Sequence, residues 1–253
     1  MRTSFLNQYE FLLSICTTIG KTWHYLLGVT GLTEIQYNKI MTPAYKVILP
    51  KIGPSEKIPL EIHYASTTLF GLGLPDIYSQ QGIEHIKLFL SRINSGSKIG
   101  YMLSVLLEYI NLEIGCDKNI LQLNFHKWGF LLHNCWLKTL WKFCHEHNIL
   151  LQGDYNQLKP QRVNDACLME MLVNDLQGFF SQKDILSINR CRLYLRVFCF
   201  SNLALSNGKQ FDEAMVSGVR DPYRLSTPPW PFQIRPPQKN WDCFRKCVQL
   251  VWT

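Results

Sequence analysis

The sequence lacks every short motif that would identify a catalytic centre. It has no Asp-Asp pair, no Gly-rich phosphate loop ending in Lys-Ser or Lys-Thr, and no Gly-x-Ser-x-Gly elbow. Its only adjacent acidic pair, Asp212-Glu213, lies in a polar stretch without a hairpin pattern. Because two-metal polymerases need carboxylates that hold two cations side by side, these absences exclude a polymerase active site from the chain.

Charge and long apolar runs are also scarce. Charged residues make up 18% of the chain, below the roughly 25% of soluble domains, and no run of 18 apolar residues occurs. We therefore expect no membrane-spanning segment. The 47% of hydrophobic and 13% of aromatic residues suffice for a buried core and exclude a disordered chain. A weakly charged, aromatic-rich surface further predicts that either a partner or another part of a longer protein covers some of it.

Nine cysteines, an odd number at irregular spacing, favour reduced and mostly buried thiols. The N-terminal residues show no secretory pattern, because Asn7, Gln8 and Glu10 interrupt the apolar residues that follow Arg2. We expect an intracellular protein of the cytoplasm or nucleus that is not secreted.

The strongest candidate for a metal site is the group Cys135, Cys144, His145 and His147. Structural zinc sites usually pair their ligands as C-x2–4-C and H-x3–5-H, and adjacent Cys144 and His145 would project about 100° apart on a helix. The spacing instead predicts a helix end with histidines near its negative pole. We therefore expect no metal and no cofactor.

Hydrophobic periodicity predicts a mainly α fold, an irregular helical bundle with one or two short strands and an extended Pro-rich tail. A short strand is expected at 61–65, and six prolines between residues 219 and 241 predict the tail. The predicted helices cover about 4–19, 33–49 with a break at Pro43, 80–93, 103–114, 128–147, 167–176 and 241–252.

Residues 189–200 fit two patterns. Basic and aromatic residues alternate with apolar ones, which is typical of a strand, whereas Ser181 followed by Asp184 is typical of a helix start that would extend into this stretch. Residues four apart share a face in both conformations. Arg192 and Arg196 are therefore expected to point the same way.

Composition divides the chain into three expected segments. Residues 1–78 hold the first helices and a Pro/Gly-rich loop, residues 79–180 a helical body, and residues 181–253 a basic segment with aromatics and the tail. The net charge is +7, to which residues 191–253 contribute nine basic against four acidic side chains. Such a stretch suits a phosphate backbone and stacked bases; the alternative is a solvated basic face.

Three passages carry a resemblance to a known family. They are the predicted helix at 35–49 followed by Gly71-Leu72-Gly73-Leu74 and Gln80-Gln81-Gly82, then Asn189-Arg190-Cys191-Arg192-Leu193-Tyr194-Leu195, and finally Trp230-Pro231 with Gln233, Pro236 and Trp241. In this order they resemble the thumb and C-terminal region downstream of the palm in reverse transcriptases of non-LTR retrotransposons. Fingers, palm and the catalytic aspartates have no counterpart in the sequence.

The resemblance implies a thumb-like bundle that grips a template–primer duplex of RNA and DNA through its backbone, without reading sequence. The polymerase core that the sequence lacks is a further implied partner. Gly71 and Gly73 would permit a tight turn, and Tyr194 would stack on a base unless it is a core tyrosine. The implied phosphate ligands are Lys39, Lys46, Lys51, Lys57, Arg190, Arg192 and Arg196.

Two other functions remain open. The low charge and many aromatics also fit a helical protein-interaction domain that does not bind nucleic acid. An unrecognised metal- or thiol-dependent enzyme could use His133, His145 or a cysteine as nucleophile or base. Nothing else in the sequence indicates that this chain alone is an enzyme.

Overall fold

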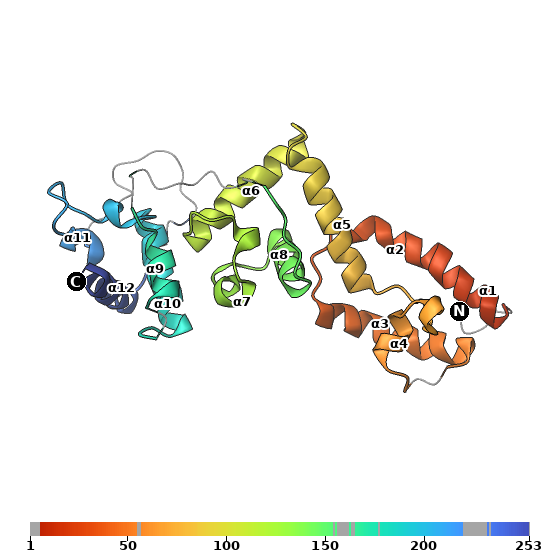
Figure 1. Cartoon of the computed structure of the whole chain (residues 1–253). Helices are drawn as coiled ribbons and strands as arrows, with labels where there is room; N and C mark the ends of the chain where they lie inside the picture. The colour runs from red at the N-terminus through yellow and green to blue at the C-terminus, as the bar shows by residue number, and fades with distance from the viewer. Residues whose placement is uncertain are drawn as a thin grey trace. The chain divides into compact units, whose positions relative to one another are not determined.

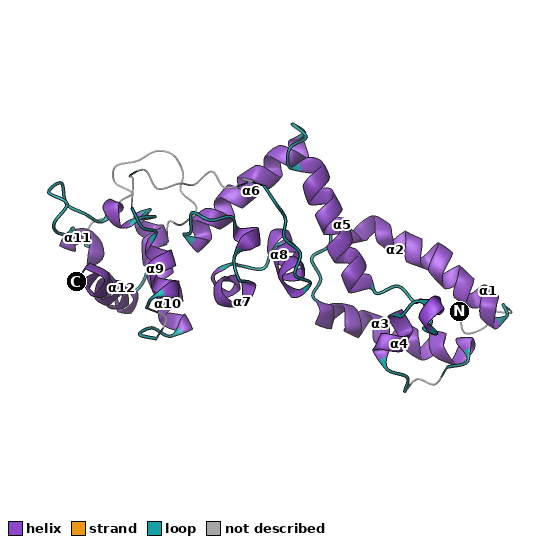
Figure 2. Ribbon diagram, viewed as in Figure 1, coloured by secondary structure: helices purple, strands orange, loops and turns teal. Residues whose placement is uncertain are grey.

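Helices make up nearly all the regular structure of the chain (Figure 1; Figure 2). The computed structural model describes residues 6–54, 57–153, 155, 162, 165–176, 178–219, 232 and 234–252. In these residues, pairing between extended segments is limited to two isolated bridges, Cys167 with Cys199 and Ala204 with Phe211. The mainly α prediction is confirmed. No helix in this part of the chain has the length and hydrophobicity needed to cross a bilayer.

The helices form two compact units, each with its own core. The first unit comprises residues 1–100 and 134–144, and the second comprises residues 101–133 and 145–253. These units divide the chain differently from the three expected segments. The boundary expected after residue 78 lies inside the first unit, because α5 (Ile77–Arg92) packs against α2 and α3 there.

Each unit is built from helices of very different length. Besides α5, the first unit contains α1 (Gln8–Ser14), a π-helix (Ile15–Ile19), α2 (Gly20–Leu27), α3 (Glu34–Ile52), α4 (Leu60–Tyr64), the 3-10 helix Thr67–Leu69 and most of α8 (Trp136–Glu146). The second contains most of α6 (Lys98–Ile114), α7 (Phe125–Trp128), α9 (Leu168–Asn174), α10 (Gln182–Leu195), α11 (Glu213–Val216), α12 (Gln238–Trp252) and the 3-10 helices Ile120–Gln122, Gly129–Leu131 and Phe200–Asn202.

Helix α3 is longer and more regular than predicted. It begins at Thr33, as predicted, with a capping box in which Thr33 N donates to Gln36 Oε1 at 2.8 Å and Gln36 N donates to Thr33 Oγ1 at 3.3 Å. Pro43 and Pro50 lie inside the helix, so the predicted break at Pro43 is wrong. Both prolines are exposed, and the carbonyls four residues before them can be hydrated in place of accepting a helical N–H.

The strand expected at 61–65 is wrong, because this stretch forms helix α4. The following loop folds back over the end of α4, where the N–H groups of Leu72 and Gly73 donate to the carbonyls of Ile62 and Ala65 at 2.9 Å. Carbonyls in the last turn of a helix have no partner within the helix. The returning loop supplies their donors and stabilises the short helix.

A buried polar network joins α5 to the turn between α2 and α3. The Gln81 side chain is fully buried, and its Oε1 accepts from Tyr37 Oη at 2.7 Å and Thr30 Oγ1 at 3.0 Å. It also accepts from Leu32 N at 3.2 Å, and Gln81 Nε2 donates to Leu32 O at 2.9 Å. One turn further along α5, His85 Nε2 lies 2.6 Å from Thr30 O. Both side chains therefore fix the turn to α5.

The first unit is expected to lose stability below about pH 6.5 because of His85. Burial lowers the pKa of this imidazole from its ordinary 6.5, so it stays neutral when folded and takes up a proton when unfolded. The unfolded state then binds more protons, and the free energy of unfolding rises with pH up to about pH 7 and is flat above it. Urea unfolding followed by circular dichroism from pH 5 to 8 measures this slope.

A matched pair of variants assigns that slope to its group. His85→Gln keeps a donor that can reach the Thr30 carbonyl and removes the titrating ring, so its profile should be flatter than that of the wild type. His24→Gln, at an exposed position on α2, is the matched control, because it removes a histidine and keeps the contact between His85 and Thr30. A residual slope in His85→Gln is expected from His63, whose pKa burial also lowers. Equal slopes in wild type and His85→Gln would contradict the assignment.

Residues 189–195 of the ambiguous stretch are helical, because they belong to α10. The helix begins at the expected start, where Ser181 and Asp184 form a capping box. It ends at Arg196, whose φ of +60° is left-handed. Arg192 thus lies in the helix and Arg196 beyond it, so the expectation that both point the same way, which assumed one regular conformation, loses its basis.

Helices α10 and α12 pack along each other and form the core of the second unit. The rings of Tyr194 and Trp241 meet edge to face with centroids 5.9 Å apart, and Trp241 Nε1 donates to Pro236 O at 3.0 Å. Helix α12 contains the closing helix predicted at 241–252. Most of the predicted Pro-rich tail falls on residues 220–231 and 233, which lie outside the described residues.

Candidate nucleic-acid interface

Two of the predicted phosphate ligands share one side of α3. Lys39 and Lys46 are seven residues apart, so they leave the helix within about 20° of each other and about 10 Å apart along its axis. Both are exposed, whereas Tyr37, Met41 and Ile48 on the opposite side are buried. We define the lysine face as the exposed side of α3 formed by Ile35, Lys39, Thr42, Pro43, Lys46 and Pro50.

The lysine face has no acidic side chain. Between Glu34 and Glu56 the sequence contains three lysines and no aspartate or glutamate. Glu34, Glu61 and Asp76 line a hollow of about 270 Å³ in which α3 contributes its other side, including Tyr37. An anion that approaches the lysine face therefore meets two ammonium groups, and no carboxylate on this side of the helix repels it.

The other two predicted lysines do not belong to this face. Lys51 Nζ lies 5.1 Å from the centroid of the Phe11 ring, over α1. Lys57 is exposed in the connection between α3 and α4. Of the four lysines that the resemblance implied, the structure thus brings two onto one surface.

Arg192 is fully buried and holds the end of α6. Its guanidinium donates to the carbonyls of Leu112 at 2.7 Å and Glu113 at 2.9 Å, in the last turn of that helix. It also donates to Val197 O at 3.2 Å and, through Nε, to Asn189 Oδ1 at 2.8 Å. These helix-end carbonyls are the negative pole of α6. The predicted phosphate contact of Arg192 is wrong, because the side chain is enclosed and its acceptors are protein atoms.

Gly115 makes room for this guanidinium. Its φ is +77°, a left-handed conformation at the end of α6 that favours glycine. A Cβ there would lie 2.7 Å from Arg192 Cζ and 2.8 Å from Met169 Cγ. The helix end, the glycine and the arginine therefore form one structural unit.

The remaining residues of this motif have different environments. Tyr194 is buried against Trp241, so the predicted base stacking is wrong and the core-tyrosine alternative holds. Arg196 is half-buried beyond the helix, and Arg190 is exposed. Of the three arginines, Arg190 is the one whose surroundings suit contact with a ligand.

Gly71 and Gly73 occupy positions that disfavour a side chain. A Cβ at Gly71 would lie 2.1 Å from Ala65 O, and Gly73 has a φ of +62°. Both belong to the loop that returns over α4. In the structure, both glycines allow the backbone of this loop to adopt its conformation.

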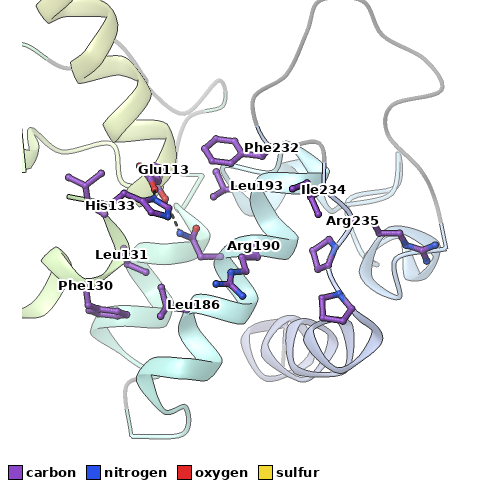
Figure 3. A pocket seen from close by; sticks show the side chains of 14 residues that line it. Glu113, Phe130, Leu131, His133, Leu186, Arg190, Leu193, Phe232, Ile234 and Arg235 are labelled. Atoms are coloured by element: carbon purple, nitrogen blue, oxygen red, sulfur yellow. Dashed lines mark hydrogen bonds and ion pairs between the residues drawn. The ribbon is translucent and has the colours of Figure 1, made fainter. Parts of the chain in front are cut away.

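The second unit contains a cavity of about 560 Å³ that the sequence did not reveal. Leu186, Arg190 and Leu193 contribute to it from α10, and Ile234 and Arg235 from the segment before α12 (Figure 3). Its surface is mostly apolar, with charged groups of both signs. The arginines are 45 residues apart in the sequence, so no local pattern indicates that they line one space.

An acidic and a basic side chain meet at this cavity. Glu113 is 2% exposed, and its Oε1 is hydrogen-bonded to Nδ1 of the exposed His133 (Figure 3). In the sequence, Glu113 stands at the end of an apolar helical stripe. The periodicity of this stripe predicts a helix but does not predict a site at Glu113. The sequence offers His133 as a possible enzymatic base, but residue spacing does not predict its pairing with Glu113.

In the described residues, one group of side chains could hold a metal ion. The ligand atoms of Cys116, Asp117 and Glu170 lie within 4.8 Å of one another. Glu170 already pairs with Lys118, and burial raises the pKa of the Cys116 thiol to about 11, which keeps it protonated. The candidate ligands within 135–147 form no such group in the described part of the chain.

Eight of the nine thiols are in surroundings that disfavour the thiolate. A thiolate is the reactive form, and burial in apolar surroundings disfavours it. The enzyme alternative that uses a cysteine therefore gains no support from these side chains. Burial raises the pKa of Cys16, Cys116, Cys144, Cys167, Cys191, Cys199, Cys243 and Cys247.

No family model, curated protein or solved structure matches the chain.

Proposed function

We propose that this chain is a non-catalytic nucleic-acid-binding module, resembling the thumb side of a retroelement reverse transcriptase, that holds the backbone of a template–primer duplex by the lysine face of α3. The observation that supports this is the exposed pair Lys39 and Lys46 on a helix side without carboxylates. Their separation of about 10 Å matches the rise of about three base pairs of a duplex.

The distribution of charge agrees with this assignment. The residues of the first unit include eleven basic and six acidic side chains, a net charge of +5, whereas those of the second unit give +2. The basic excess thus belongs mainly to the unit that contains α3. A positive unit attracts a polyanion before any specific contact forms.

Replacing both lysines, Lys39→Gln with Lys46→Gln, should weaken binding of a primed RNA–DNA duplex and reduce its salt dependence. Each phosphate contact contributes about one to the slope of log K against log salt, so the slope should fall by about 2. Fluorescence anisotropy of a labelled duplex between about 50 and 200 mM salt measures both.

The control removes the same charge from another surface of the first unit. Lys87 and Lys98 are exposed, and Lys87 pairs with Glu84 at 2.7 Å. Lys87→Gln with Lys98→Gln should leave the slope within experimental error of the wild type. Equal slopes for both double variants would contradict the assignment to the lysine face, and absence of binding at about 50 mM salt would overturn nucleic-acid binding itself.

A helical protein-interaction domain is the second candidate. It is favoured by exposed apolar side chains along α2 and its C-terminal end, where Tyr25 is 89%, Leu26 57% and Val29 71% exposed. This function predicts binding that changes little with salt and does not depend on Lys39 or Lys46.

A further inference from the structure

Two cysteines of the second unit face each other across a short antiparallel contact. Cys167 and Cys199 form an isolated bridge between two extended segments. The N–H groups of Leu168 and Phe200, one residue beyond each cysteine, donate at 3.2 and 3.1 Å to the carbonyls of the residues that precede the opposite cysteine. These hydrogen bonds flank the two cysteines, which therefore occupy the non-hydrogen-bonded position of an antiparallel pair.

The geometry of this pair is suited to a disulfide. The α-carbons of a non-hydrogen-bonded antiparallel pair are about 4.5 Å apart, and those of disulfide-bonded cysteines are about 4.4–6.8 Å apart. The thiols of Cys167 and Cys199 are hydrogen-bonded to each other, so the two side chains point toward one another. A bond between the sulfur atoms therefore needs little movement of the backbone.

The surroundings make Cys199 the better nucleophile of the two. Burial raises the pKa of both thiols, that of Cys199 to about 11. The hydrogen bond between the thiols and the guanidinium of Arg192 lower the pKa of Cys199 against this effect, whereas the same hydrogen bond raises the pKa of Cys167 further. Because the thiolate is the attacking form, Cys199 is the thiol that reacts first.

We propose that Cys167 and Cys199 form a reversible disulfide, with a low-molecular-weight disulfide as the oxidant. The Cys199 thiolate attacks one sulfur of the oxidant, whose S–S bond breaks and releases one thiolate. The Cys167 thiolate then attacks the Cys199 sulfur of the mixed disulfide and releases the second thiolate. The released thiolates take up the two protons that the cysteines lose, so the chain gives up two electrons and the oxidant becomes two thiols.

The bond closes a loop that contains α9 and α10. Cys167 directly precedes α9, and Cys199 lies in the segment that follows α10. A cross-link over a loop of about 30 residues removes conformations from the unfolded chain and so favours the folded one. The oxidised second unit is therefore more stable than the reduced one.

Burial determines how fast the bond forms and breaks. Cys167 is 2% and Cys199 3% exposed, so a reagent reaches them only when the contact opens. The bridge is isolated and is not part of a sheet, and local opening of a small contact needs less free energy than unfolding of the whole unit. Exchange is therefore slow, but it does not require global unfolding.

Prolonged incubation of the whole folded chain with oxidised glutathione, followed by N-ethylmaleimide and non-reducing peptide mapping by mass spectrometry, tests the proposal. A cross-linked peptide pair that joins Cys167 to Cys199 is expected, and dithiothreitol should restore both thiols. The oxidised chain should unfold at a urea concentration about 1–2 M higher than the reduced chain. Two unreacted thiols, or Cys199 left bonded to glutathione without closure, would overturn the proposal.

Cys247→Ala is the matched control, because Cys247 is also buried in the second unit and does not belong to the bridge. This variant should keep both the cross-link and the shift in urea concentration, which Cys199→Ala should lose. Oxidation of the wild type in concentrated urea, where the fold is absent, should give a mixture of cysteine pairs. The same mixture from the folded chain would show that the fold does not select this pair and would also overturn the proposal.

Discussion

Replacing Arg192 with alanine is expected to lower the free energy of unfolding of the second unit by about 3–5 kcal/mol. The guanidinium is the donor for the carbonyls of Leu112, Glu113 and Val197 and for the Asn189 side chain. Alanine would leave these acceptors buried without the guanidinium as their donor. It would also open a cavity beside Gly115. Urea unfolding followed by tryptophan fluorescence measures the loss.

Arg190→Ala is the matched control, because Arg190 lies two residues away on the same helix and is exposed. Arginine and alanine have similar helix propensities, so this variant should remain within about 0.5 kcal/mol of the wild type. If Arg192→Ala lowered the free energy of unfolding no more than Arg190→Ala does, the hydrogen bonds from Arg192 would not be needed to stabilise the C-terminal end of α6.

Periodicity and capping signals were sufficient for most helices. Helix α3 begins as predicted at Thr33, and α10 begins at Ser181, in agreement with the helical one of the two patterns left open for that stretch. The errors arose where the surroundings of a residue override its local signal. Pro43 is tolerated because it lies on the exposed side of α3, and the predicted strand at 61–65 is helical because the loop that follows it folds back and supplies donors to its last carbonyls.

The predicted site was harder to derive because a basic side chain has the same appearance in the sequence whether it is exposed or buried. Arg190 and Arg192 stand two apart in one motif, yet one is exposed and the other fully enclosed. The difference depends on the end of α6, about 80 residues earlier, which places carbonyls beside Arg192. The pairing of Glu113 with His133 also depends on distant chain segments.

The passages that carry the family resemblance mostly contain residues that hold the fold. Asn189 and Arg192 secure the end of α6, and Gly71 shapes the loop over α4. Gly82, next to Gln81 in α5, lets α8 approach, since a Cβ there would lie 2.4 Å from the ring of Phe143. Because these residues hold the fold of the chain itself, they give no evidence of a ligand, and the proposed duplex contact rests instead on the exposed lysines of α3.

Gln81→Leu is expected to lower the free energy of unfolding of the first unit by about 2–4 kcal/mol. Leucine has nearly the same size, so little cavity forms, but Tyr37 Oη, Thr30 Oγ1 and both backbone groups of Leu32 lose the partner that Gln81 provides. Burial of polar groups without partners is the source of the loss. Gln80→Leu is the control, because Gln80 is half-buried on the same helix and has no side-chain hydrogen bond to the described residues. Urea unfolding of both variants measures the difference, and equal stability of the two would show that the turn between α2 and α3 is held by apolar packing instead of this network.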